Sequence, residues 1–181
     1  MTLVVADTCS LVNFAVMGRV DLLEATLRGR AHWTQAVEYE VRMMASGIQT
    51  LKLIVDGGWL GHAIELDTPQ DRTAVTAFRA FLGGTSDRPL QHLGEAESIQ
   101  AVLSRSHLRD AVLLTDDHDA TLLANSKQVR VWNTAALLAD AFQRGDIGHP
   151  AAYELLRSMR QVGSTGLRST RHVRLNRDRE Q

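Results

Sequence analysis

Two kinds of hydrophobic pattern alternate along the chain. Leu3–Ala6 and the apolar part of "DAVLLTDD" around residue 112 are short apolar runs without polar alternation, as in strands buried on both faces, and Val129–Trp132 is a third short predicted strand. The segments between them space their apolar residues three or four positions apart, which is typical of helices packed on a core. The alternation predicts an α/β fold with a mostly parallel central sheet flanked by helices.

The helical spacing defines most of the predicted elements. Thr34 is a suitable N-cap for a helix whose apolar stripe is Val37, Val41 and Met44. Helices are also predicted at residues 10–17, 18–29, 71–81, 93–106, 117–125, 134–144 and 151–162. Residues 51–55 and 61–69 are predicted to be extended, with a turn at "DGG" between them, and residues 83–89 ("GGTSDRP") to be a loop.

The chain changes character after "GDIGHP". Residues 1–145 carry the alternating pattern and form the predicted domain, while residues 146–181 are expected to add a helix and a basic tail. From Arg157 to Gln181 there are seven arginines and two acidic residues, a net charge of +5. Large apolar residues are scarce in this tail, so we expect it to be flexible when alone.

The composition narrows the class of protein. The overall net charge of −1 excludes a strongly basic protein that coats nucleic acids, although a local basic surface remains compatible. The only cysteine, Cys9, has no partner for an internal disulfide. The start "MTLVVAD" does not resemble a signal peptide, and no apolar run reaches the ~18 residues of a membrane span. We expect a soluble, cytoplasmic protein that does not associate with membranes.

Acidic residues recur where elements begin or end. Asp7 and the Asp116–Asp117 pair follow predicted strands, Glu40 borders the apolar stripe of its helix, and Glu95 lies in the first turn of another. The carboxyl ends of parallel strands meet at one edge of the sheet, so these side chains are expected to converge. Taken singly, each has an ordinary explanation as a helix cap, a first-turn acid or a solvated helix residue.

Converging carboxylates favour a metal site. They repel one another, and burying them unpaired is costly, so a divalent cation would stabilise the group. Oxygen ligands suit Mg²⁺ or Mn²⁺ rather than zinc, and the seven histidines show no metal-site spacing. Such ions activate water and stabilise the charge that develops in phosphodiester hydrolysis.

Four segments, in order, resemble the PIN-domain nucleases: "VVADTCSLVNF", "AVEYEV", "LGEAESIQAVL" and "LLTDDHDATLLA". The resemblance runs from about Leu3 to Phe142, and its most specific parts are the opening motif and the "GEAE…LLTDD" pair. It implies a three-layer α/β/α fold and a metal-dependent endoribonuclease acting on RNA. Many small bacterial members are VapC-type toxins, which implies a DNA-binding antitoxin as a candidate partner and is compatible with a homodimer.

The resemblance assigns roles to individual residues. It matches Asp7, Glu40, Glu95 and Asp117 to the four family acids, and Ser10 to a hydroxyl residue beside the first acid that would hold a water on the metal. Three neighbours compete for these roles: Glu38 with Glu40, Glu97 with Glu95, and Asp116 with Asp117. Residues two apart on a helix face different directions, so at most one glutamate of each pair is expected to point into the site.

Other interpretations remain open. A phosphatase of the haloacid-dehalogenase type would use Asp7 as its nucleophile, but it usually has a second Asp two residues later, where this chain has Cys9. A non-catalytic PIN-like scaffold or regulatory module is the third hypothesis. Cys9 is interpreted as a packing residue. Three arginines, Arg72, Arg79 and Arg88, could line an RNA path or form a solvated face.

Overall fold

A four-stranded parallel sheet forms the centre of the molecule, and this confirms the predicted, mostly parallel central sheet. The computed structural model describes residues 1–161, and in it the strands follow the order β2 (Ala31–His32), β1 (Val4–Ala6), β3 (Val112–Leu114) and β4 (Arg130–Trp132). Every neighbouring pair is parallel, with Val5 level with Leu113 and Leu113 level with Val131. The carboxyl ends of all four strands therefore lie at the same edge.

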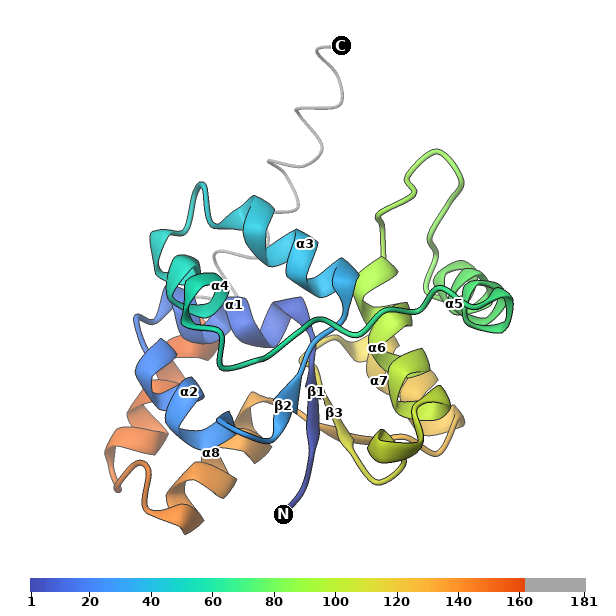
Figure 1. The fold of residues 1–181 in the computed structure, drawn as a ribbon. Coiled ribbons are helices and arrows are strands. Elements are labelled where there is room, and N and C mark those ends of the chain that lie inside the picture. Colours follow the sequence, from blue (N-terminus) through green and yellow to red (C-terminus); the bar gives the residue numbers. More distant parts are fainter. Residues whose placement is uncertain (162–181) are drawn as a thin grey trace.

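Helices cover both faces of this sheet, which confirms the predicted three-layer α/β/α architecture (Figure 1). The α-helices are α1 (Thr8–Val16), α2 (Val20–Leu27), α3 (Gln35–Met44), α4 (Lys52–Gly57), α5 (Pro69–Phe81), α6 (Leu93–Ser104), α7 (His118–Ser126) and α8 (Thr134–Arg144). Two short 3₁₀ turns are η1 (Gln49–Leu51) and η2 (Ser106–Leu108), and a further helix occupies residues 151–161.

The alternation of side chains along β1 divides the core in two. Val4 and Ala6 belong to a cluster that includes buried residues of α1, α2, α3 and α8. Val5, between them, belongs to a second cluster with residues of α5, α6 and α7. This is the period of two that a strand imposes, and it places a helical layer on each face.

Two sequence predictions about local structure are wrong. Residues 51–55, predicted to be extended, form η1 and α4 instead, because a short apolar run does not distinguish a strand from a buried helix. Residues 61–69 contribute only an isolated bridge between Ile64 and Thr34. Conversely β2 was not predicted, since two residues are too few to show a pattern.

A buried ionic cluster fixes α5 against α6. Asp71, in the first turn of α5, accepts hydrogen bonds from Gln100 Nε2 of α6 and from Arg105 Nη2, each at 2.9 Å. Burial favours the neutral acid, but these donors and the Thr68 hydroxyl hold the pKa of Asp71 well below its usual value. These contacts hold α6, the helix that carries Glu95, against α5.

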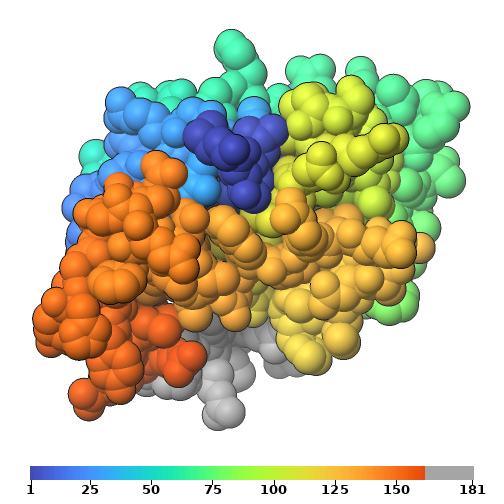
Figure 2. Space-filling model, turned by 90° about the horizontal axis from the view of Figure 1, so that it is seen from below, coloured from blue at the N-terminus to red at the C-terminus, as the bar shows by residue number. Residues whose placement is uncertain are grey.

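Helix 151–161 packs on the first cluster through Leu155 and Met159. Figure 2 views the molecule from the side on which the N-terminal residues are visible, and the red surface of this helix lies there beside the orange surface of α8. The predicted basic tail lies outside the described residues from position 162 onward. None of the described helices is long and apolar enough to cross a membrane.

Candidate metal centre

Asp7 lies at the end of the central strand β1 and is almost completely buried. It is the N-cap of α1, because its Oδ1 accepts the Thr8 N–H at 2.7 Å. Its other oxygen, Oδ2, accepts from the Cys9 thiol at 3.1 Å and from the Thr115 hydroxyl at 3.0 Å. Asp7 is therefore both a cap and an oriented carboxylate.

Cys9 and Thr115 connect the ends of β1 and β3. Thr115 Oγ1 donates to Asp7 and accepts the Asp117 N–H at 3.1 Å, while Cys9 Sγ accepts the Asp116 N–H at 3.4 Å. The sequence alone indicated a packing role for Cys9 and no role for Thr115. The available signal was the position of Thr115, a hydroxyl residue at a strand end directly before two acids.

Glu40 reaches this region from α3. The Thr8 hydroxyl donates to Glu40 Oε2 at 2.6 Å, so the first turn of α1 orients the carboxylate. The same oxygen lies 3.3 Å from the position that a Cβ on Gly94 would occupy, which places Glu40 against the start of α6. Glu38 instead forms a surface ion pair with Arg42, four residues along the same helix.

The two glutamates of α6 have different surroundings. Glu95 is near enough to Asp7 for its charge to raise the pKa of Asp7, and its Oε1 lies 3.5 Å from Nδ1 of His92. Glu97 Oε2 accepts the Ala36 N–H at 3.0 Å, in the first turn of α3. Burial raises the pKa of Glu97, against the effect of that hydrogen bond.

The two aspartates after β3 also differ. Asp117 is the N-cap of α7, with Oδ1 accepting the Ala120 N–H at 2.7 Å. Asp116 accepts hydrogen bonds from Thr134 at the start of α8, from its backbone N–H at 2.8 Å and from the Thr134 hydroxyl. It also accepts from Asn13 Nδ2 of α1 at 2.8 Å. Asp116 is thereby held by α1 and α8.

Electrostatics mark Asp7 as the centre of the acidic group. Burial, followed by the charges of Glu95 and Glu40, raises the pKa of Asp7 to about 8, against the lowering effect of its hydrogen bonds. Within residues 1–161, no arginine or lysine pairs with its carboxylate. A divalent cation fits this donor set chemically, since it prefers carboxylate oxygens and would stabilise the ionised form of Asp7.

The carboxylates of the described residues do not form a complete set of metal ligands. Among the described residues, no three His, Cys, Asp or Glu side chains stand close enough to hold a metal ion as a group. Figure 1 shows α1, α3 and α6 meeting above the ends of β1 and β3. Glu95 and Glu40 lie near enough to Asp7 there for their charges to raise its pKa. Ser10 is fully buried, and its hydroxyl lies 3.9 Å from Cys9 Sγ.

Arg79, which the sequence suggests for an RNA path or a solvated face, binds the loop before α6. Its guanidinium donates to the carbonyl oxygens of Gln91 at 3.0 Å, Thr85 at 3.3 Å and Arg88 at 2.9 Å. Gly84 fits closely inside this loop, because a Cβ there would lie 3.0 Å from the backbone oxygens of Arg79 and Gln91. The loop ends at the residues that open α6.

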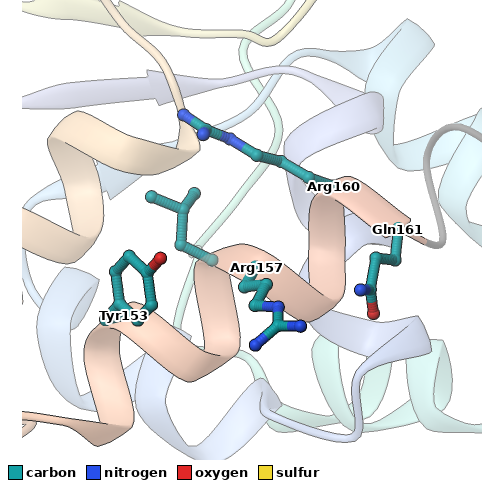
Figure 3. A pocket seen from close by; sticks show the side chains of 5 residues that line it. Tyr153, Arg157, Arg160 and Gln161 are labelled. Atoms are coloured by element: carbon teal, nitrogen blue, oxygen red, sulfur yellow. The ribbon is translucent and has the colours of Figure 1, made fainter.

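A separate pocket of about 250 Å³ lies on helix 151–161. Figure 3 shows the side chains that line it: Tyr153, Leu156, Arg157, Arg160 and Gln161. None of the predicted acidic ligands contributes to its wall. The pocket is therefore distinct from the acidic region at the strand ends.

Comparison with protein families gives the family of this chain. A family described as a PIN domain matches residues 3–173, which includes every acidic residue discussed above. No curated protein and no solved structure matches the chain.

Proposed function

The chain belongs to the PIN-domain family, and from this premise we propose that it is a Mg²⁺- or Mn²⁺-dependent endoribonuclease. PIN domains are generally nucleases and generally use divalent metals, so hydrolysis of nucleic-acid phosphodiester bonds is the class of activity that the family indicates. The proposal adds the substrate, RNA, and the residues that act on it. The match also favours a nuclease over the phosphatase hypothesis.

The environment of Asp7 is the observation that carries the proposal. A buried carboxylate at the end of the central strand has two acidic neighbours, Glu95 and Glu40, and its pKa rises accordingly. Such an arrangement is costly for folding alone, and it is the kind of cost that functional sites retain. A hard divalent cation is the ligand whose charge and oxygen preference would balance it.

The proposed division of labour follows the contacts. Asp7, Glu40 and Glu95 would hold the metal, with Asp117 contributing Oδ2, which makes no hydrogen bond within residues 1–161. Thr8 orients Glu40 by donating to its Oε2, and Thr115 and Cys9 orient Asp7. When bound, the metal supplies water activation and stabilises the charge of an in-line phosphoryl displacement.

A cleavage assay tests the proposal. We expect the chain to cut end-labelled RNA in Mn²⁺ or Mg²⁺, leaving 5′-phosphate and 3′-hydroxyl ends, and to lose activity in EDTA. Asp7→Asn should lose cleavage while it keeps the α1 cap, because asparagine also caps helices. Asp56→Asn is the matched control, since Asp56 is exposed on α4. Cleavage that persists unchanged in both EDTA and Asp7→Asn would show that the metal mechanism is wrong.

Calorimetry separates the nuclease from a non-catalytic module. We expect Mn²⁺ binding by the intact chain and weaker binding by Asp7→Asn. Absence of Mn²⁺ uptake together with absence of cleavage would favour a PIN-like scaffold or regulatory protein. Single-stranded DNA of the same sequence, assayed in parallel, shows whether RNA is the preferred substrate.

We further propose that this nuclease is the toxin of a type II toxin–antitoxin module. Support comes from the family alone, by analogy with its small toxin members. The proposal predicts growth arrest on expression, relief by Asp7→Asn, and a neighbouring gene for a small DNA-binding antitoxin that binds this chain. Normal growth with abundant active nuclease would exclude the toxin role and leave the nuclease intact. The same proposal includes a homodimer, which sedimentation of the chain in solution would detect.

A further inference from the structure

The start of α3 is held by a residue of α6. Three backbone N–H groups open α3, and each has an acceptor: Gln35 N–H bonds to Ile64 O at 3.2 Å, and Val37 N–H to Thr34 Oγ1 at 3.5 Å. The remaining N–H, of Ala36, donates to Glu97 Oε2 at 3.0 Å. A carboxylate is a strong acceptor at a helix N-terminus, where the helix dipole favours negative charge. Glu97 therefore connects the two helices directly.

A second contact joins the same helix faces. Glu40 lies four residues after Ala36, and Gly94 lies three residues before Glu97, so each pair shares one side of its helix. Glu40 Oε2 lies 3.3 Å from the position of a Cβ on Gly94, and a bulkier residue there would displace it. The Glu97 contact and the Gly94 contact are one helical turn apart. Fixing the first therefore fixes where Glu40 lies relative to α6.

From this geometry we infer that Glu97 is a positioning residue of the nuclease site, which holds α3 on α6 and thereby sets the place of Glu40 beside Glu95 and Asp7. The inference rests on the proposed function. Glu97 acts through Ala36 and makes its contact with α3. Glu95, two residues earlier, projects from a different side of α6 and reaches the neighbourhood of Asp7.

Substitutions at Glu97 distinguish positioning from metal ligation. Glu97→Gln keeps the side-chain length and an oxygen acceptor for the Ala36 N–H, but it removes the charge. We expect its kcat to stay within about threefold of the wild-type value. Glu97→Ala removes the acceptor, and we expect kcat to fall about 10–100-fold with little change in KM, as when other residues that orient ligands are removed. Glu95→Gln, which loses a ligand charge, should abolish cleavage.

Two controls complete this set. Glu97→Asp keeps the charge, but its side chain is one methylene shorter and should not reach the Ala36 N–H, so we expect the same loss of kcat as in Glu97→Ala. It serves as the second variant if Glu97→Ala folds poorly. Glu38→Ala removes a partly exposed partner of Arg42 on the same helix as Glu40 and should leave kcat unchanged. Abolition of cleavage by Glu97→Gln, to the level of Glu95→Gln, would overturn the inference by making Glu97 a ligand. Full activity of Glu97→Ala would overturn it as well.

Hydrogen exchange provides a readout that does not depend on activity. In the intact chain we expect the Ala36 amide to exchange slowly in the wild type and in Glu97→Gln, and at least tenfold faster in Glu97→Ala. Equal exchange rates in all three would refute the link between the helices. If the wild type cleaves no RNA, the proposed function fails, while the exchange data still decide whether Glu97 holds α3.

Discussion

The hydroxyl of Thr115 donates to Asp7 Oδ2 at 3.0 Å and, in the same geometry, accepts the backbone N–H of Asp117 at 3.1 Å. One side chain thus joins the acids at the ends of β1 and β3. Thr115→Val keeps the shape of the side chain but leaves the Asp117 N–H unpaired. We expect a loss of about 1–3 kcal/mol in the free energy of unfolding and about 10–100-fold in RNA cleavage. Thr115→Ser, which keeps the hydroxyl, should stay near the wild type in both assays.

The raised pKa of Asp7 predicts how stability depends on pH. Burial and the charges of Glu95 and Glu40 raise this pKa from 3.8 to about 8, so the folded chain holds the proton more tightly than the unfolded chain. The stabilising contribution is complete below pH about 4 and is lost as the pH rises through about 8. Without divalent metal, urea unfolding should therefore show lower stability at pH about 8.5 than at pH about 5.

Asp7→Asn is the control for this pH effect, because asparagine does not titrate. It should flatten the dependence, and Mn²⁺ should restore the stability of the wild type at high pH by binding the ionised form. An equally steep decrease in stability for Asp7→Asn would assign the pH dependence to another group.

Gly94→Ala should separate activity from stability. The new Cβ would lie 3.3 Å from Glu40 Oε2 and 3.4 Å from Val37 Cγ2, so the Glu40 carboxylate must shift. Alanine favours a helix over glycine by about 1 kcal/mol, so the free energy of unfolding should stay level or rise. Cleavage should nevertheless fall about tenfold, because small displacements of catalytic groups are costly. Gly47→Ala is the matched control, since its nearest neighbour is an ordinary 3.8 Å away.

Arg79→Ala tests whether this arginine serves the loop or the RNA. Losing three hydrogen bonds to carbonyl oxygens should lower the free energy of unfolding by about 1–2 kcal/mol. Arg72→Ala, on the exposed side of the same helix, should change it by less than about 0.5 kcal/mol. An Arg79→Ala variant with unchanged stability but a raised KM for RNA would restore the RNA-path interpretation.

Cys9 should be chemically inert in the folded chain. Desolvation and the neighbouring charge of Asp7 raise the pKa of its thiol well above the usual value, and the thiolate is the reactive form. Iodoacetamide at pH about 8 should therefore modify the chain only after unfolding in urea. Cys9 is the single cysteine, so intact mass gives the answer directly. Rapid alkylation of the native chain would contradict this environment.

The fold was largely predictable because its signals are local. Two of the four strands, β1 and β3, are apolar runs that stop at a polar or acidic residue, and the helices show regular spacing. The exceptions lack such a signal: β2 has two residues, and α4 begins within an apolar run that suits either structure. Pairing with β1 and burial of Ile54 decided those cases, and both are tertiary effects.

The acids of the candidate site could be proposed from the sequence, but their contacts could not. The sequence left Glu38 and Glu40 as alternatives, and the structure pairs Glu38 with Arg42 while Thr8 binds Glu40. No pattern along the chain could place Thr115 on Asp7 or Glu97 on Ala36, since these contacts join residues 108 and 61 positions apart. The variants described above test which of these acids bind the metal.

The acids at the strand ends also hold helices together: Asp7 caps α1, Asp117 caps α7, and Asp116 binds the start of α8. The proposed metal-binding role and the structural role together constrain how the chain can evolve. At Asp7 and Asp117, a change to alanine would remove a proposed metal ligand and a helix cap at once, whereas a change to asparagine removes the charge and keeps the cap. Lineages of this fold that abandon catalysis but stay folded are therefore expected to carry asparagine where this chain has aspartate.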